Sequence, residues 1–151
     1  MAFTSEFTND PTPVGGGERV GDSHIILTAS TFEDGLLTGR FAKLDNGSVD
    51  NLDGSATPVL AGVVLRHASR ATEDENEIST ELYANAEYAR WGLVTVFAKN
   101  GETVPDRFAT VYASNAGDAD DGLATSTDTD TETTAEFIAE VQTGVWLVFI
   151  K

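Results

Sequence analysis

The sequence predicts an all-β fold: a single compact β-barrel or β-sandwich domain with an extended N-terminal arm. Three observations predict it. Short apolar stretches rich in β-branched and aromatic residues recur along the chain. Turn-forming residues separate these stretches about every ten residues, as in sandwiches and small barrels. Finally, 151 residues of which 40% are hydrophobic are enough for the core of one domain.

Residues 1–21 are expected to form the arm, and residues 22–151 the β domain. Phe3 and Phe7 are the aromatic residues of the arm and are too few to build a core. Two interpretations are open: a frayed terminus, or an arm that docks on a neighbouring subunit through the two rings. The residues that interrupt regular structure here are Pro11, Pro13, Gly15, Gly16, Gly17 and Gly21.

Seven segments of the β domain have the length and composition of strands. The clearest alternation of apolar and polar side chains is at 77–83. Tight turns are expected at 45–47 and 100–101, and a polar loop over 48–58. The expected strands are 24–29, 36–44, 59–66, 77–83, 91–98, 108–114 and 145–150.

The segment 132–142 fits two structures. Ala135, Ile138 and Ala139 have the spacing of one helix face, and Gly144 is placed to cap such a helix. The same residues also suit a strand that turns directly into the last strand. Periodicity slightly favours the helix, whereas the predicted strands around the segment favour a strand.

The charge of the chain limits its partners. Nine Lys and Arg against 25 Asp and Glu give a formal net charge of -16. Nucleic acid and anionic membranes are therefore not expected as partners, because binding them requires cationic side chains. Two interpretations of the acidity remain: docking on a cationic protein surface, or adaptation to high salt, which the scarcity of lysine also fits.

No catalytic residue, cofactor-binding residue or metal ligand is expected. The chain has no cysteine and no serine in a Gly-x-Ser-x-Gly turn. His24 opens one expected strand and His67 closes another, so both are interpreted as structural. Three acidic clusters are interpreted as solvated loops, because none fits the calcium-loop template. They are 73–75 with Glu77, Asp118 with 120–121, and Asp128 with Asp130 and Glu132.

The aromatic residues separate into core and interface candidates. Trp146 lies in an unbroken apolar run and is expected in the core. Tyr88 lies in the polar stretch 85–90 and is expected to reach the surface beside Arg90. Tyrosine and arginine are common anchors of protein interfaces. The candidate interface residues are Phe3, Phe7, Tyr88, Arg90 and Trp91.

Six short motifs follow one another in a definite order across most of residues 20–151. They are Gly39-Arg40-Phe41, Asp45-Asn46-Gly47, Gly62-Val63-Val64, Trp91-Gly92-Leu93-Val94, Val111-Tyr112-Ala113-Ser114 and the segment from Gly144 to Ile150. Each motif alone is common in β proteins. The ordered set resembles the structural cement (capsid decoration) proteins of tailed bacteriophages.

The resemblance implies a non-enzymatic protein of the virion that binds the capsid exterior and bridges major capsid protein subunits. Such a protein stabilises the assembled shell by mass action, and many linked copies strengthen attachment. The major capsid protein and the chain itself, as a homodimer or homotrimer, are the expected partners. The family pattern also makes 135–141 a strand. The loops 70–76 and 116–134 depart from that pattern in being unusually acidic.

Two other classes of protein remain as alternatives. A carbohydrate- or receptor-binding β domain of a virion tail or cell surface is expected to display coplanar exposed aromatic rings on one face. A hydrolase that uses two carboxylates is expected to have a deep cleft holding an acid with a raised pKa.

Overall fold

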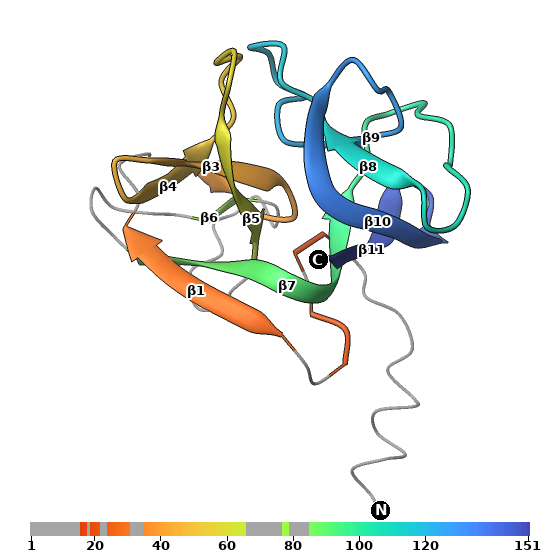
Figure 1. Ribbon diagram of the computed structural model, residues 1–151, viewed down its shortest axis with the longest axis horizontal. Helices are drawn as coiled ribbons and strands as arrows, with labels where there is room; N and C mark the ends of the chain where they lie inside the picture. Colours follow the sequence, from red (N-terminus) through yellow and green to blue (C-terminus); the bar gives the residue numbers. More distant parts are fainter. Residues whose placement is uncertain (1–15, 18, 22–23, 31–34, 66–76, 79–84) are drawn as a thin grey trace, which may run out of the picture.

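The computed structural model describes residues 16–17, 19–21, 24–30, 35–65, 77–78 and 85–151. These residues form eleven strands and no helix, which confirms the predicted all-β class (Figure 1). The strands are β1 (Ile25–Ser30), β2 (Leu36–Leu37), β3 (Phe41–Asp45), β4 (Ser48–Asn51), β5 (Val59–Val64), β6 (Glu77–Ile78), β7 (Asn85–Phe97), β8 (Thr110–Ala113), β9 (Ala124–Thr125), β10 (Thr131–Gln142) and β11 (Val145–Ile150).

The long strand β7 is shared by two curled halves of one sheet. The order of the nine-stranded sheet is β1-β4-β3-β5-β7-β11-β10-β8-β9, and β2 pairs separately with β6. In Figure 1, β7 passes from the half that contains β1, β3, β4 and β5 to the half that contains β8 to β11.

Both halves curl back towards β7. In the first half, β1 pairs with β7 along its whole length and meets β4 at the single pair Ser30–Ser48. In the second half, Ala124 of β9 bridges to Ala98, the residue after β7. Curling in this way gives each half an enclosed side that apolar residues can fill.

Two clusters of buried side chains form the core. The larger one contains Trp146 and Phe137, whose rings meet edge to face with centroids 5.4 Å apart. Trp146 is 1% exposed, so its predicted place in the core is confirmed. The second cluster lies under the first half of the sheet and includes Leu36, Val49 and Tyr88.

The contested segment 132–142 is a strand, β10. Thr133, Ala135 and Phe137 are buried, whereas Thr134 is exposed and Glu136 is partly exposed between them. This period of two is the pattern of a strand with one covered face. The helical spacing of Ala135, Ile138 and Ala139 was therefore coincidental.

Several predicted boundaries change. The expected strand 36–44 is divided into β2 and β3 because Gly39 has φ of +70°. The polar loop expected over 48–58 begins with β4, which pairs with β3 around the predicted turn at 45–47. The very short β9 has no clear signal in the sequence. Of the expected strand 77–83, residues 79–83 lie outside the described residues.

The described residues between 16 and 21 contact the sheet. The amides of Gly17 and Val20 donate to the carbonyls of Thr95 and Leu93, at 2.6 and 3.0 Å. Gly16 is buried, and a Cβ placed on it would lie 2.6 Å from the ring of Phe97. The division between arm and domain at residue 22 stays a prediction. Phe3 and Phe7 lie outside the described residues.

Candidate interaction surface

Three exposed apolar side chains and the half-buried Phe149 lie on β1, β7 and β11, where β7 pairs with each of the other two strands. The ring of Trp91 on β7 meets that of Phe149 on β11 edge to face, with centroids 5.3 Å apart and an interplanar angle of 76°. Ile25 on β1 is the register partner of Trp91. Trp91 is 36% exposed, Ile25 52% and Leu27 43%. We call these four residues the Trp91 surface.

The strands that carry the Trp91 surface have almost no charge. β1 and β11 contain no charged residue. β7 contains only Glu87 and Arg90, whose opposite charges sum to zero. The whole chain has a net charge of -16. A like-charged or acidic partner therefore meets less repulsion at these strands than at the loops.

Arg90, one of the predicted interface residues, also has an intramolecular role. The pairing of β1 with β7 passes from Ala89 to Trp91 and skips Arg90, which makes Arg90 an extra residue of β7. Its Nη1 donates to the carbonyl oxygens of Leu60 at 2.7 Å and Ala61 at 3.0 Å. The guanidinium thus links β7 to β5 where the two strands diverge.

Tyr88 does not reach the surface of the chain. It is 5% exposed and packs in the second core cluster with Leu36 and Val49. Its polar sequence neighbours suggested exposure, but β7 has strands on both edges at this point, β1 and β5. The ring lies on the enclosed face of this half, where Leu36 and Val49 pack in the same cluster, so the prediction that Tyr88 is a surface residue is wrong.

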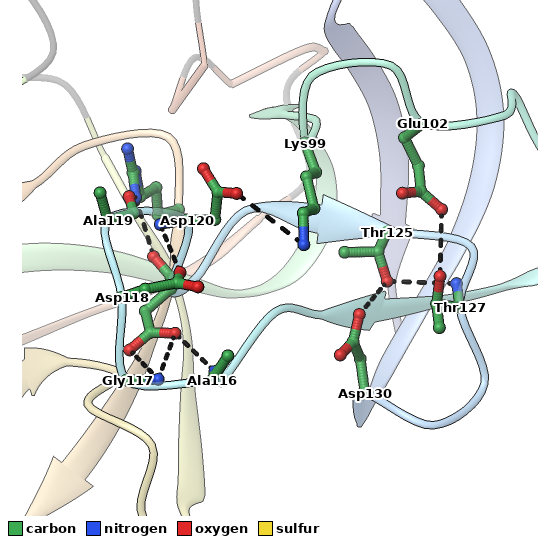
Figure 2. A network of polar contacts seen from close by, with 12 residues as sticks. Lys99, Glu102, Ala116, Gly117, Asp118, Ala119, Asp120, Thr125, Thr127 and Asp130 are labelled. Atoms are coloured by element: carbon green, nitrogen blue, oxygen red, sulfur yellow. Dashed lines mark hydrogen bonds and ion pairs between the residues drawn. The ribbon is translucent and has the colours of Figure 1, made fainter.

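The acidic loop 116–121 is held by its own carboxylates (Figure 2). Oδ1 of Asp121 accepts hydrogen bonds from the amides of Ala116 at 2.7 Å and Gly117 at 3.0 Å. Oδ1 of Asp118 accepts one from the amide of Asp120 at 2.9 Å. These bonds satisfy backbone donors in tight turns. The cluster is therefore a structural element of the loop.

The carboxylates around Asp130 also accept hydrogen bonds from nearby backbone and hydroxyl groups (Figure 2). Thr125 donates its hydroxyl to Oδ2 of Asp130 at 2.8 Å. Glu102 accepts from both the amide and the hydroxyl of Ser126, at 2.8 and 2.6 Å. In the described part of the chain, no three Asp, Glu or His side chains come together as a metal site would require. His24 lies with Nε2 2.7 Å from the carbonyl oxygen of Leu93.

The described surface has two open clefts between the halves. One, of about 410 Å³, lies between the loop 54–58 and residues 129–132 and is mainly polar. The other, of about 250 Å³, includes Phe41, Leu60 and Arg90 in its lining. Neither is lined by a histidine, so neither offers a general base of the usual kind near neutral pH.

One carboxyl group has a clearly shifted pKa. The ammonium of Lys43, with Nζ 2.6 Å from Oδ2 of Asp53, and then the Ser55 hydroxyl lower the pKa of Asp53 to about 2. Hydrogen bonds to the ionised carboxylate favour the charged form. A lowered pKa is the opposite of what a general acid of a hydrolase needs.

Of the predicted interface residues, only Trp91 and Arg90 are exposed in the described structure. Ile25, Leu27 and Phe149 were not among the predicted interface residues, because they lie within apolar strand segments and have no polar neighbours that would single them out. Their alternation gives no sign of exposure. The exposure of the β1 side chains can be recognised only when the position of β1 in the sheet is known.

Comparisons with known proteins agree with this architecture. A model of the family described as XM1 gp53 minor capsid protein matches residues 12–151. A chain in the solved structure "The capsid of Myoviridae Phage XM1" has 31% sequence identity and a TM-score of 0.82, covering 93% of this chain and 91% of that chain. A search of curated proteins found no match. The described residues contain no helix able to span a membrane.

These matches, together with the all-β fold, define the class first: structural proteins associated with bacteriophage capsids. Within that class, the chain belongs to the XM1 gp53 minor capsid protein family. The predicted membership of a phage capsid-associated family is thereby confirmed.

Proposed function

We propose that this protein is a non-enzymatic decoration (cement) protein that binds the exterior of a viral capsid and bridges major capsid protein subunits. The observation that carries the proposal is the likeness, at 31% identity over 93% of the chain, to a chain in the capsid of phage XM1. A bridging protein stabilises a shell by binding its assembled state in preference to separate subunits. No chemical step is needed for that role.

The Trp91 surface supports this proposal. Tryptophan is a frequent anchor of interfaces, and exposed apolar groups gain free energy when a partner covers them. We assign the capsid contact to Trp91 and Phe149, whose rings meet on two strands with no net charge. Phe3 and Phe7 remain candidate contacts on a neighbouring subunit.

The charge supports a cationic partner surface around that contact. At a net charge of -16, copies crowded on a shell repel one another unless salt, divalent ions or cationic capsid groups lie between them. Attachment to shells is accordingly expected to vary with ionic strength.

The geometry does not favour the carbohydrate-binding alternative. Sugar-binding platforms use rings that lie in one plane, whereas the rings of Trp91 and Phe149 are 76° apart. The hydrolase alternative also lacks support, because the one strongly shifted carboxyl in the described residues, Asp53, has a lowered pKa.

Cosedimentation with purified shells tests the proposal. The wild-type protein is expected to bind intact shells and to raise the temperature at which they release DNA. Trp91→Ala is expected to bind at least about tenfold more weakly, because a buried aromatic anchor contributes several times RT. Val59→Ala, which removes an apolar residue 65% exposed on β5, is the matched control. Failure of the wild type to bind any shell would disprove the proposal.

A further inference from the structure

Along most of its outer edge, β1 has no strand partner among the described residues. On one edge β1 pairs with β7 over all six of its residues. On the other, among the described residues, only Ser30 has a strand partner, Ser48 of β4. The backbone groups along 25–29 on that edge thus lack a partner strand in the described chain. Such an edge is a template for pairing with another chain.

Within the described part of the chain, this edge carries none of the usual protection. Natural proteins guard exposed edges with lysine, proline, inward-pointing charge or a covering loop. The sequence of β1 is Ile-Ile-Leu-Thr-Ala-Ser, with no charge and no proline. Ile25 and Leu27 are 52% and 43% exposed, and Thr28 is exposed as well. An apolar, unguarded edge of this kind needs a covering partner.

The charge distribution identifies the partner as a second copy. Two chains of -16 repel strongly unless they meet through surfaces without carboxylates. β1 is such a surface, and two copies of it are complementary to each other by symmetry. We infer that the protein dimerises by antiparallel pairing of β1 with β1 of a second copy, which extends the sheet across a two-fold axis.

This arrangement deepens the proposed function, on which it partly rests. A two-fold axis perpendicular to the joined sheets leaves the same face of both copies on the same side. The two Trp91 surfaces then become one continuous apolar face. A dimer can contact two capsid subunits at once, and paired contacts strengthen attachment without new chemistry.

Sedimentation equilibrium tests the pairing directly. The chain has a mass of 16.0 kDa, so the free protein is expected to sediment as a particle of twice that mass, more tightly associated at high salt. Leu27→Glu is expected to weaken association at least about tenfold, because an apolar contact is lost and two carboxylates face each other. Val104→Glu changes a residue of the same 43% exposure away from β1 and is expected to leave association unchanged.

Cross-linking supplies a second measurement that does not depend on a destabilising substitution. Opposite residues of an antiparallel pair point to the same face, so one residue of β1 must lie opposite its own copy. The chain has no cysteine, so single cysteines introduced over 25–29 report on this pairing alone. Mild oxidation is expected to give a disulfide-linked dimer most rapidly at one of these positions, and not with Val104→Cys.

Several results would overturn the inference. A monomer at all salt concentrations, a trimer, or equal effects of Leu27→Glu and Val104→Glu would each contradict it. A monomer whose shell binding is lost in Leu27→Glu would show that the capsid, not a second copy, covers Leu27. A β1-linked dimer that binds no shell would support the pairing and disprove the cement function.

Discussion

Arg90 and Leu60 are joined across the point where the two halves of the sheet separate, with Nη1 of the arginine 2.7 Å from the carbonyl oxygen of the leucine. At this point β7 leaves β5 and continues along β11. The carbonyls of Leu60 and Ala61 consequently have no partner strand on that edge among the described residues. The guanidinium supplies the donor that a strand would otherwise provide.

Arg90→Ala is expected to lower the free energy of unfolding by about 1–3 kcal/mol, because two carbonyls at the divergence lose a charged donor. Urea unfolding followed by tryptophan fluorescence measures the change. Arg107→Ala is the matched control, since that guanidinium lies over the ring of Phe108, 5.1 Å from its centroid, in an exposed loop. Equal losses in the two variants would contradict the role assigned to Arg90.

Gly62→Ala is expected to destabilise the fold by about 3 kcal/mol or more. A Cβ on Gly62 would lie 2.0 Å from the carbonyl oxygen of Ala89, and the φ of +146° is already unfavourable for other residues. Thermal unfolding measures the loss. Gly101→Ala is the control, with φ of +75° and open space around its Cβ. A similar melting temperature for both variants would show that β5 and β7 can separate at no cost.

A chain that begins at Gly16 is expected to melt at the temperature of the full protein, whereas one that begins at His24 is expected to melt roughly 5–10 °C lower. The shorter chain loses the hydrogen bonds from Gly17 to Thr95 and from Val20 to Leu93. It also loses the packing of Gly16 against Phe97. Scanning calorimetry compares the two. Identical melting would support a domain that begins at residue 22.

The pKa of Asp53 predicts one component of acid sensitivity. Its folded-state pKa of about 2 lies below the ordinary value of 3.8, so the ionised form is favoured by the fold. The resulting stabilisation is present above about pH 4 and is lost as the pH falls towards 2. Lys43→Met is expected to flatten the dependence of stability on pH in this window. Unfolding curves at pH 5, 4, 3 and 2 for both proteins measure the difference, and parallel curves would contradict it.

Local signals determined much of the fold. The turn at Asn46-Gly47 was predicted from two residues, and both have positive φ, +49° and +84°, as a tight hairpin turn requires. The last strand, β11, was predicted with its bounds at Val145–Ile150. Tight turns and apolar strands depend on residues that are neighbours in the sequence, so they can be predicted from it. The net charge of -16 follows from composition alone and predicts that nucleic acid is not a partner.

The candidate surface depended on contacts between distant residues. Tyr88 was expected at the surface, yet it is 5% exposed, whereas its register partner Leu27, which was not among the predicted interface residues, is 43% exposed. Strand composition shows that a residue belongs to a sheet, but not whether its strand is central or at an edge.

What the sequence alone determined was an acidic, all-β chain without disulfides, whose ordered motifs matched a capsid-associated family. Only the tertiary structure decided that β7 pairs within both halves of the sheet, that Arg90 donates to the carbonyls at the edge of β5, and that most of one edge of β1 has no partner among the described residues. These features depend on contacts between residues far apart in the sequence, such as Leu60 with Arg90, 30 positions apart, and Ile25 with Trp91, 66 positions apart. The packing of the whole domain selects which strands pair across such separations. One sequence is compatible with many strand pairings and registers, and only one of them fills the core.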